Sequence, residues 1–234
     1  MLKLNKTLFV SALLASSVSF AGEWKGEGDL GYNSVAGNSE SEALAVKLLI
    51  SYVQNDWTHK AEVSANTASN DDKTSAEAYT FNFNSRYEIN EDVYGFGNYR
   101  YQDDRFSAFE YQSSLTGGVG YHVIKTEDTI LDAEVGAGFR SSERRLNQEK
   151  EDEAVILGKV SYKQQLTDTT KLESYLLSEA GEENTYLEAE VAVKVAMTEQ
   201  LALKIAYLAK HNTDVDPGTE KTDRYTTVSL NYNF

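Results

Sequence analysis

The chain has 234 residues, a formal net charge of −15 and no cysteine. Disulfide bonds therefore contribute nothing to its stability, and the acidity makes nucleic acid an unsuitable partner and cations more suitable ones. The length allows one large β domain or two small domains, and because the composition nowhere changes abruptly we treat the chain as one domain. Fifteen tyrosines, fifteen glycines and a single proline are typical of long β-strands, since proline cannot donate a hydrogen bond to a ladder.

The first 21 residues have the layout of a secretory signal peptide. Lys3 and Lys6 precede an apolar run over residues 8–14, and small residues then lead to Ala21. A membrane anchor is the alternative, but this run is far shorter than the ~20 residues that a spanning helix needs. We therefore expect residues 1–21 to be a signal peptide cleaved after Ala21, and residues 22–234 to form the mature domain.

Alternation of apolar and polar residues predicts twelve strands in the mature chain. The expected ranges are 23–35, 39–53, 56–68, 73–87, 92–103, 108–123, 129–141, 153–164, 169–180, 184–196, 200–211 and 221–234. Most of them are longer than the ~5–6 residues usual in soluble sheets and reach the ~9–11 residues needed to cross a bilayer on a tilt. The pattern favours membrane-spanning strands.

One face of each predicted strand is apolar and is expected to face lipid. Clear examples are Leu44, Val46, Leu48, Ile50 and Tyr52; Tyr79, Phe81, Phe83 and Tyr87; Phe109, Tyr111, Leu115, Val119 and Tyr121; and Leu201, Leu203, Ile205 and Tyr207. Two strands carry apolar residues on both faces: Val93, Tyr99 and Tyr101 against Tyr94 and Phe96 in the fifth, and Leu172 and Leu176 against Tyr175 and Leu177 in the ninth. For these two strands the pattern does not decide which face points outward.

The connections and the aromatic residues indicate which end of the barrel is which. Every second connection is short, whereas the others include the long, charged segments 142–152 and 212–220, an asymmetry typical of outer-membrane barrels with periplasmic turns. Amphipathic rings are favoured at both membrane interfaces. At the short-turn end we expect a girdle of Trp24, Tyr52, Trp57, Tyr87, Tyr121, Tyr162 and Phe234. Nearer the other end we expect Tyr32, Tyr101, Phe109, Phe139 and Tyr186.

The last predicted strand, residues 221–234, ends on Phe234. It resembles the closing strand of bacterial outer-membrane barrels, whose terminal aromatic residue is read by the barrel-insertion machinery. We expect this strand to pair with residues 22–35, because lipid cannot solvate an open strand edge. A soluble β-sandwich is the alternative, but strand length, the asymmetry of the connections and the terminal aromatic residue favour a membrane barrel.

The polar face is the expected lining of the lumen. It carries charges of both signs: Lys47, Lys60, Glu62, Arg86, Arg100, Glu110, Glu134, Arg140, Lys159, Lys163, Glu173, Glu188, Glu190, Lys194 and Lys204. A wide, water-filled porin is one interpretation, but so many long, oppositely charged side chains can also fill a modest lumen with ion pairs. We favour a narrow or blocked pore.

No cofactor, metal site or catalytic residue is assigned from the sequence. The acidic segment 214–218 lacks most ligands of a calcium loop, although divalent cations bridging acidic loops to anionic lipids remain candidate partners. The available histidines are His59, His122 and His211, and none is placed in a recognisable Ser-His relay. A lipid-modifying activity would depend on His211, at the outer end of its strand, or on another residue at the rim.

Several short patterns together resemble the YdiY-like domain of unknown function, a family of salt-induced outer-membrane proteins. They are Trp24, Lys25, Gly26, Glu27, Gly28 and Gly31; Gly37, Asn38 and Ser39; Trp57; Tyr101, Asp103, Asp104, Arg105 and Phe106; Gly117 to Gly120; and Glu134 to Arg140. The resemblance implies an outer-membrane barrel without an established activity and with a link to salt or osmotic conditions. It supplies no catalytic residues. Gly37 and Asn38 suit a tight hairpin, and Asp104 and Arg105 are expected to pair at the outer rim.

Taken together, the sequence predicts an all-β, monomeric, antiparallel transmembrane β-barrel of about twelve strands in the bacterial outer membrane. The expected role is non-enzymatic, as a structural or narrow-channel component. The expected partners are outer-membrane lipids, lipopolysaccharide and the insertion machinery that reads Phe234. Two alternatives remain: a lipid-modifying enzyme with an active site at the rim, and a soluble periplasmic β-barrel that binds a ligand.

Overall fold

The computed structural model describes residues 22–35, 41–70 and 73–234, which form twelve antiparallel strands. The strands are β1 (Glu23–Val35), β2 (Ser41–Gln54), β3 (Trp57–Asn70), β4 (Lys73–Glu88), β5 (Val93–Asp104), β6 (Phe109–Lys125), β7 (Thr129–Arg144), β8 (Lys150–Thr167), β9 (Thr170–Ala180), β10 (Thr185–Ala196), β11 (Leu201–Asn212) and β12 (Thr222–Asn233). The predicted signal peptide and the predicted turn at Gly37 and Asn38 lie outside the described residues. Within those residues, no helix has the length and apolar character to cross a membrane.

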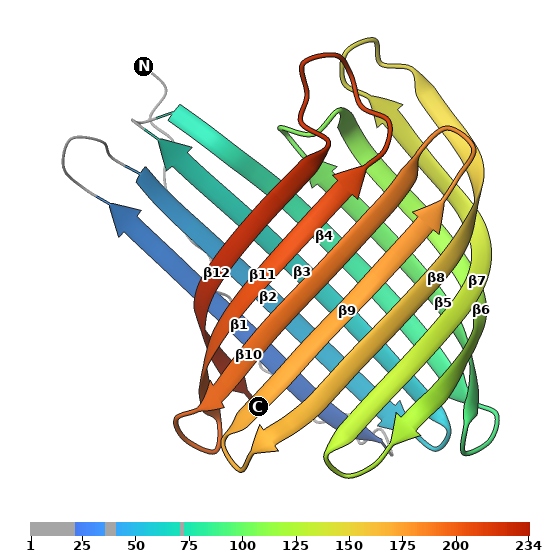
Figure 1. The fold of residues 1–234 in the computed structure, drawn as a ribbon, viewed down its shortest axis with the longest axis vertical. Helices are drawn as coiled ribbons and strands as arrows, with labels where there is room; N and C mark the ends of the chain where they lie inside the picture. The colour runs from blue at the N-terminus through green and yellow to red at the C-terminus, as the bar shows by residue number, and fades with distance from the viewer. Residues whose placement is uncertain (1–21, 36–40, 71–72) are drawn as a thin grey trace.

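The strands close into one barrel in which each strand pairs with its neighbours in sequence, and β1 pairs with β12 (Figure 1). The pairing of β1 and β12 runs from Glu27 opposite Asn233 to Gly31 opposite Ser229. The amide of Gly26 donates to the carbonyl of Phe234 at 2.7 Å, and the amide of Phe234 donates back at 3.0 Å. The Phe234 ring covers Gly26 so closely that a Cβ there would lie 2.1 Å from it. The predicted closed, antiparallel barrel is confirmed.

The hairpin of β7 and β8 is longer than the sequence indicated. The predicted loop 142–152 is wrong, because Ser142 pairs with Glu151 and Glu143 with Lys150, so that only residues 145–149 connect the strands. The run of charges in this segment suggested a solvated loop. Arg144 instead binds Glu151 across the two strands at 2.7 Å, which allows charged residues to continue the ladder.

The outer face of the barrel carries the apolar side of the alternating pattern. Leu115, Val228 and Ile205 are 62%, 55% and 52% exposed, as expected for side chains that face lipid rather than a protein core. The two ambiguous strands are also resolved. Tyr94 of β5 is fully buried inside the barrel, and in β9 Leu176 faces outward while Leu177 is buried.

Two aromatic residues predicted to face lipid at the long-loop end point into the lumen instead. Phe109 is 2% exposed, because the register of β6 and β7 shifts between Phe109 and Tyr111 and reverses the side on which Phe109 lies. Tyr186 is fully buried, shares the parity of Glu188 on β10 and donates its hydroxyl hydrogen bond to that carboxylate. The outer end therefore has fewer aromatic residues toward lipid than expected.

Aromatic rings contact one another around the short-turn end. The rings of Trp24 and Tyr52 lie 4.6 Å apart, and those of Trp57 and Tyr87 lie 4.9 Å apart. Tyr121 and Phe234, from the same predicted girdle, are 50% and 61% exposed. Contacts of this geometry suit an interface where rings meet both apolar chains and polar headgroups.

We predict that deletion of residues 230–234 prevents assembly of the barrel. The deletion removes most of the pairing with β1 and leaves a strand edge that lipid cannot satisfy. The measurement is heat-modifiable migration of protein recovered from the outer-membrane fraction. Phe234→Tyr, which keeps a terminal aromatic ring, is the control and is expected to assemble normally. Normal heat-modifiable protein after the deletion would refute the role assigned to β12.

Candidate functional site

Most of the charged residues predicted to line the lumen do lie on inward positions. Those on inward positions are Lys47, Lys60, Glu62, Arg86, Arg100, Glu134, Arg140, Lys159, Glu188, Glu190, Lys194 and Lys204. Glu110 differs, because it lies in the irregular start of β6, where its side chain is 55% exposed. There it binds Arg145 at 2.6 Å, at the rim of the barrel.

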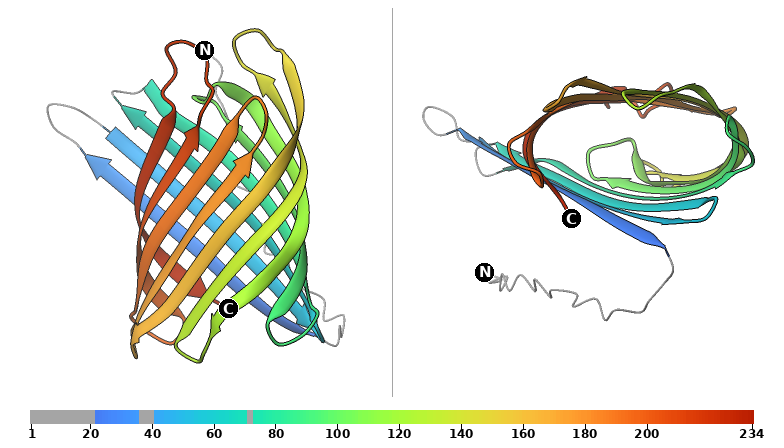
Figure 2. Two further views of the ribbon diagram at one scale, coloured as in Figure 1. Left: turned by 45° about the vertical axis from the view of Figure 1, so that its right-hand side comes forward. Right: turned by 90° about the horizontal axis from the view of Figure 1, so that it is seen from below.

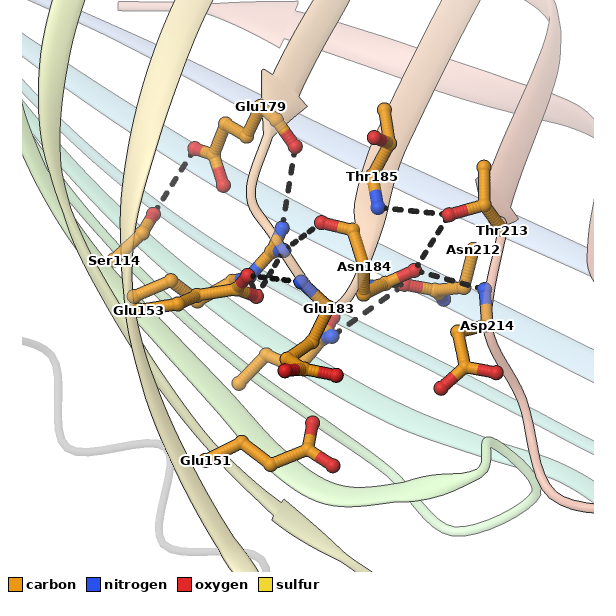
Figure 3. A network of polar contacts seen from close by, with 12 residues as sticks. Ser114, Glu151, Glu153, Glu179, Glu183, Asn184, Thr185, Asn212, Thr213 and Asp214 are labelled. Carbon is orange, nitrogen blue, oxygen red and sulfur yellow. Dashed lines mark hydrogen bonds and ion pairs between the residues drawn. The ribbon is translucent and has the colours of Figure 1, made fainter.

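Arg140 of β7 anchors the connection between β9 and β10 inside the barrel. Its side chain is fully buried, and its Nη2 binds Oε1 of Glu153 at 2.5 Å. The same guanidinium donates to the backbone carbonyls of Glu179, at 3.3 Å, and Asn184. Glu153 in turn accepts the amide hydrogen of Glu183 at 3.0 Å (Figure 3). One arginine therefore ties two strands and a loop together.

A second buried ion pair crosses the lumen next to the first. Arg100 of β5 binds Glu179 of β9 at 2.5 Å, and these side chains are 3% and 1% exposed. Ser114 donates to the other oxygen of Glu179 at 3.0 Å, as Figure 3 shows. The Arg100 guanidinium also lies 4.1 Å from the centre of the Tyr186 ring, where a cation is attracted to the π face. We call Arg100, Arg140, Glu153, Glu179 and Asn184 the plug.

Hydrogen bonds also join strands that lie on opposite sides of the closed ring. Tyr186 of β10 and Lys210 of β11 donate to Gln102 of β5 at 3.3 and 3.4 Å. Gln112 of β6 donates to Asn212 of β11 at 3.4 Å. Seen from below, the barrel has a flattened cross-section (Figure 2). The two long walls of the flattened barrel are thus in direct contact, which closes much of the lumen.

Apolar and aromatic side chains complete this closure. Tyr94, Phe96, Leu157, Leu177 and Tyr186 form one buried cluster, against which Tyr175 packs. Sequence reasoning did not place these residues in the lumen. The signal for them in the sequence is that the fifth and ninth strands have apolar residues on both faces. A strand with lipid on one side needs a second apolar face only where side chains pack inside the lumen.

A small polar chamber lies on the side of the lumen formed by β1 to β4 and β9 to β12. Its volume is about 90 Å³, and it is bordered by charged residues that include Asp29, Lys47, Glu62, Glu190 and Lys204. Lys47 binds Glu62 at 3.0 Å, and Lys204 binds Asp29 at 3.0 Å. A polar space of this size accommodates a few water molecules and no large solute.

His122 lies in a cluster of charged residues nearer the short-turn end. Its Nδ1 is 2.6 Å from Asp132 and its Nε2 is 3.1 Å from Glu88. Carboxylates only accept hydrogen bonds, so a protonated imidazole satisfies both contacts at once. Arg86 binds Glu88 at 2.7 Å, and Tyr94 donates to Glu134 at 3.0 Å. The cluster therefore joins β4, β5, β6 and β7 through ion pairs and hydrogen bonds.

The other two histidines face outward. His59 stacks on Trp57 with ring centres 5.6 Å apart, and His211 contacts the Thr222 hydroxyl at 2.8 Å. Among the described residues, no histidine is hydrogen-bonded to a serine, and no group of three or more His, Cys, Asp or Glu is placed to hold a metal ion.

The predicted pair of Asp104 and Arg105 at the outer rim is wrong. Arg105 binds Glu77 of β4 at 2.9 Å instead, while Asp104 points into the lumen and accepts hydrogen bonds from the Phe106 amide and the Tyr225 hydroxyl. Neighbours in sequence at the end of a strand point to opposite sides, which separates the two charges.

Comparisons with known proteins agree with this architecture. Residues 28–234 match the family described as protein of unknown function, DUF481. The uncharacterized protein YdiY of Escherichia coli K12 is 29% identical over 209 residues, which cover 88% of this chain and 82% of YdiY. The COG4313 outer membrane channel from Pseudomonas putida F1 has a TM-score of 0.54 at 10% identity, with 91% of this chain and 96% of the channel covered.

The NanC porin has a TM-score of 0.50 at 12% identity, with 90% of this chain and 98% of the porin covered. At such low identity these two solved structures support the fold, that of an outer-membrane barrel, and no activity. The family match covers nearly the whole barrel. The resemblance seen in the sequence is thereby confirmed, and the chain belongs to the DUF481 family of proteins of unknown function.

Proposed function

We propose that this protein is a non-enzymatic, monomeric channel of the outer membrane with a narrow conducting path. The contact between the two long walls carries the proposal, because hydrogen bonds cross the lumen where an open twelve-stranded barrel would hold a wide channel, and the chamber of about 90 Å³ beside them is small. Ions and water can pass such a chamber when its side chains move, whereas sugars and larger solutes cannot. In this proposal the short turns face the periplasm, as in other outer-membrane barrels.

The proposed link to salt conditions rests on the charges at the long-loop end. Arg144 binds Glu151 at 2.7 Å, Asp216 at 3.6 Å and also Asp214, and so holds the long β11–β12 connection against the β7–β8 hairpin. The Asp214 side chain is 51% exposed. Salt screens exposed charges, since the Debye length falls from ~10 Å at 0.1 M to ~3 Å at 1 M ionic strength. Rising salt would therefore loosen this contact.

An enzymatic role receives less support from the geometry. His211, one of the rim residues on which a lipid-modifying activity could depend, contacts the Thr222 hydroxyl at 2.8 Å, and its side chain faces outward. A soluble binding protein would be expected to bury apolar side chains such as Leu115 and Val228, which are exposed around the barrel here. Membrane lipids and lipopolysaccharide are the partners that we propose for this surface, and the insertion machinery for Phe234.

We predict a small conductance for the wild-type barrel in planar lipid bilayers and a larger one for Arg140→Ala. Removing the guanidinium leaves the buried Glu153 carboxylate without its cationic partner and releases the connection over residues 181–184. Hydration of the Glu153 carboxylate and movement of this connection then widen the path. A large, stable, porin-like conductance of the wild-type protein would contradict the proposal.

The control for this substitution is Arg105→Ala. Arg105 is at the same end of the barrel, but its side chain is 62% exposed and binds only Glu77. Its loss is expected to leave conductance unchanged. Both variants are first tested for heat-modifiable migration, so that loss of folding is separated from opening of the lumen. A folded Arg140→Ala variant with wild-type conductance would show that the plug does not limit flow.

A second prediction concerns the salt dependence of the wild-type channel. Conductance is expected to rise more steeply than the conductivity of the bathing potassium chloride solution, because salt weakens the contacts that hold the β11–β12 connection in place. Arg144→Gln, which keeps much of the side-chain volume without the charge, should abolish the excess rise. If the wild-type conductance is strictly proportional to the conductivity of the solution, the proposed link to salt is contradicted.

A further inference from the structure

Two charged side chains that border the polar chamber lack a close partner of opposite charge. Among the described residues, Lys210 of β11 is 5% exposed and its ammonium group donates only to the neutral Gln102, at 3.4 Å. Glu190 of β10 forms its one ion pair with Lys204, at 3.9 Å, and that lysine is held more closely by Asp29, at 3.0 Å. The chamber therefore has an ammonium group and a carboxylate that are both weakly compensated.

The residues beside Lys210 do not supply the missing partner. Glu188 is opposite Lys210 on β10, but its carboxylate accepts hydrogen bonds from Tyr175, at 2.7 Å, and from Tyr186. Asp223 is opposite Lys210 on β12 and does not border the chamber. In the described part of the chain, neither carboxylate lies within 4.0 Å of the Lys210 ammonium group. A buried charge with so little compensation is costly, and a ligand of opposite charge relieves that cost.

Glu190 and Lys210 are close enough for one small molecule to contact both. Glu190 is opposite Leu208 on β11, and Lys210 follows two residues later on the same face of that strand. The backbones of such diagonal neighbours lie ~7–8 Å apart in an antiparallel ladder. The two side chains border one chamber and form no ion pair with each other. A ligand that carries both charges can therefore lie between them.

The uncharged part of the chamber lining also offers groups for hydrogen bonding. Ser229 of β12 is 4% exposed, and among the described residues its hydroxyl has no hydrogen-bond partner. The chamber volume of about 90 Å³ corresponds to about six water-sized positions. The smallest amino acids have about as many non-hydrogen atoms, whereas a sugar has more. Other polar side chains of the lining without a side-chain hydrogen bond are Ser64, Asn66, Thr80 and Thr227.

The ladder between β1 and β12 ends beside the chamber. Gly31 opposite Ser229 is the last pair that the described residues form, although β1 continues beside β2 as far as Val35. Figures 1 and 2 show the two strands diverging beyond this point, toward the long-loop end. Tyr225 and Thr227, which border the chamber, lie in this stretch of β12. A solute can thus approach the chamber without breaking backbone hydrogen bonds between β1 and β12.

We propose that the polar chamber is a binding site for small zwitterions of the α-amino acid class. The ligand's ammonium group binds Glu190 and its carboxylate binds Lys210, so that each charge gains the partner that the protein does not supply. Water satisfies hydrogen bonds in the chamber but not the two charges, and a simple ion compensates only one of them. The inference goes beyond the proposed channel, because the site binds its ligand whether or not the lumen conducts.

The test uses the full mature barrel, refolded in detergent, with glycine as the probe. Isothermal titration calorimetry at neutral pH and constant ionic strength compares glycine with methylammonium and acetate, which each carry one of the two charges. We expect saturable binding of glycine to the wild type and at least tenfold weaker binding of either singly charged probe. Absence of saturable glycine binding, or an equal affinity for acetate or methylammonium, overturns the proposal.

Substitutions then test the two assigned side chains. Glu190→Gln and Lys210→Met remove one charge each at similar side-chain length, and each is expected to weaken glycine binding at least tenfold. The matched controls are Lys60→Met, at a lumen lysine that does not border the chamber, and Glu110→Gln, at the rim, where the side chain is 55% exposed. Both controls should keep the wild-type affinity. An unchanged affinity in either chamber variant, or an equal loss in a control, contradicts the site.

Folding and conduction are measured separately. Neither Glu190 nor Lys210 has a close ion pair to lose, so both variants are expected to show the heat-modifiable migration of the wild type. The comparison of glycine with the singly charged probes needs no variant, and it tests the proposal even where a variant does not fold. Glycine binding without measurable conductance would support the site and reject the channel, and conductance without glycine binding would do the reverse.

Discussion

Closure of the strand ladder is the constraint on which the rest of the structure depends, because lipid cannot satisfy an unpaired backbone edge. β1 and β12 meet this requirement where Gly26 and Phe234 exchange hydrogen bonds at 2.7 and 3.0 Å. Gly26 is needed there because the terminal ring occupies the space that a Cβ would take. Closure also dictates that every second side chain points into an enclosed space. The inward residues must then satisfy one another, since little water is available to do so.

The flattened lumen follows from how these inward residues are satisfied. A buried arginine without a partner is very costly. Arg140 binds Glu153 at 2.5 Å on the neighbouring strand, whereas Arg100 binds Glu179 at 2.5 Å across the lumen, which requires the opposite walls to approach one another. Tyr186 contributes both an apolar ring beneath Arg100 and a hydroxyl that reaches Gln102. Ion pairs and apolar packing therefore both favour a lumen filled by side chains over an open channel.

The sequence could predict the barrel, the number of strands and most inward and outward positions, because lipid imposes a period of two that is visible in single strands. It could not predict which inward residues meet. Arg100 and Glu179 are far apart in the chain, and their contact depends on the stagger of all the strands between them. Phe109 was misplaced because a local irregularity reverses parity without any mark in the sequence. Tyr94 and Leu177 were ambiguous because lumen packing and lipid exposure select the same kinds of residue.

The distribution of charge within the lumen differs from the charge of the whole chain. The protein has a net charge of −15, yet buried Lys210 has no carboxylate oxygen within 4.0 Å among the described residues and donates to neutral Gln102 instead. Near the long-loop end, Asp214 and Asp216 gather around Arg144. Because charges inside a low-dielectric wall are screened less than charges at the surface, the local arrangement of lumen charges and not the overall acidity sets the electrostatic potential inside the barrel.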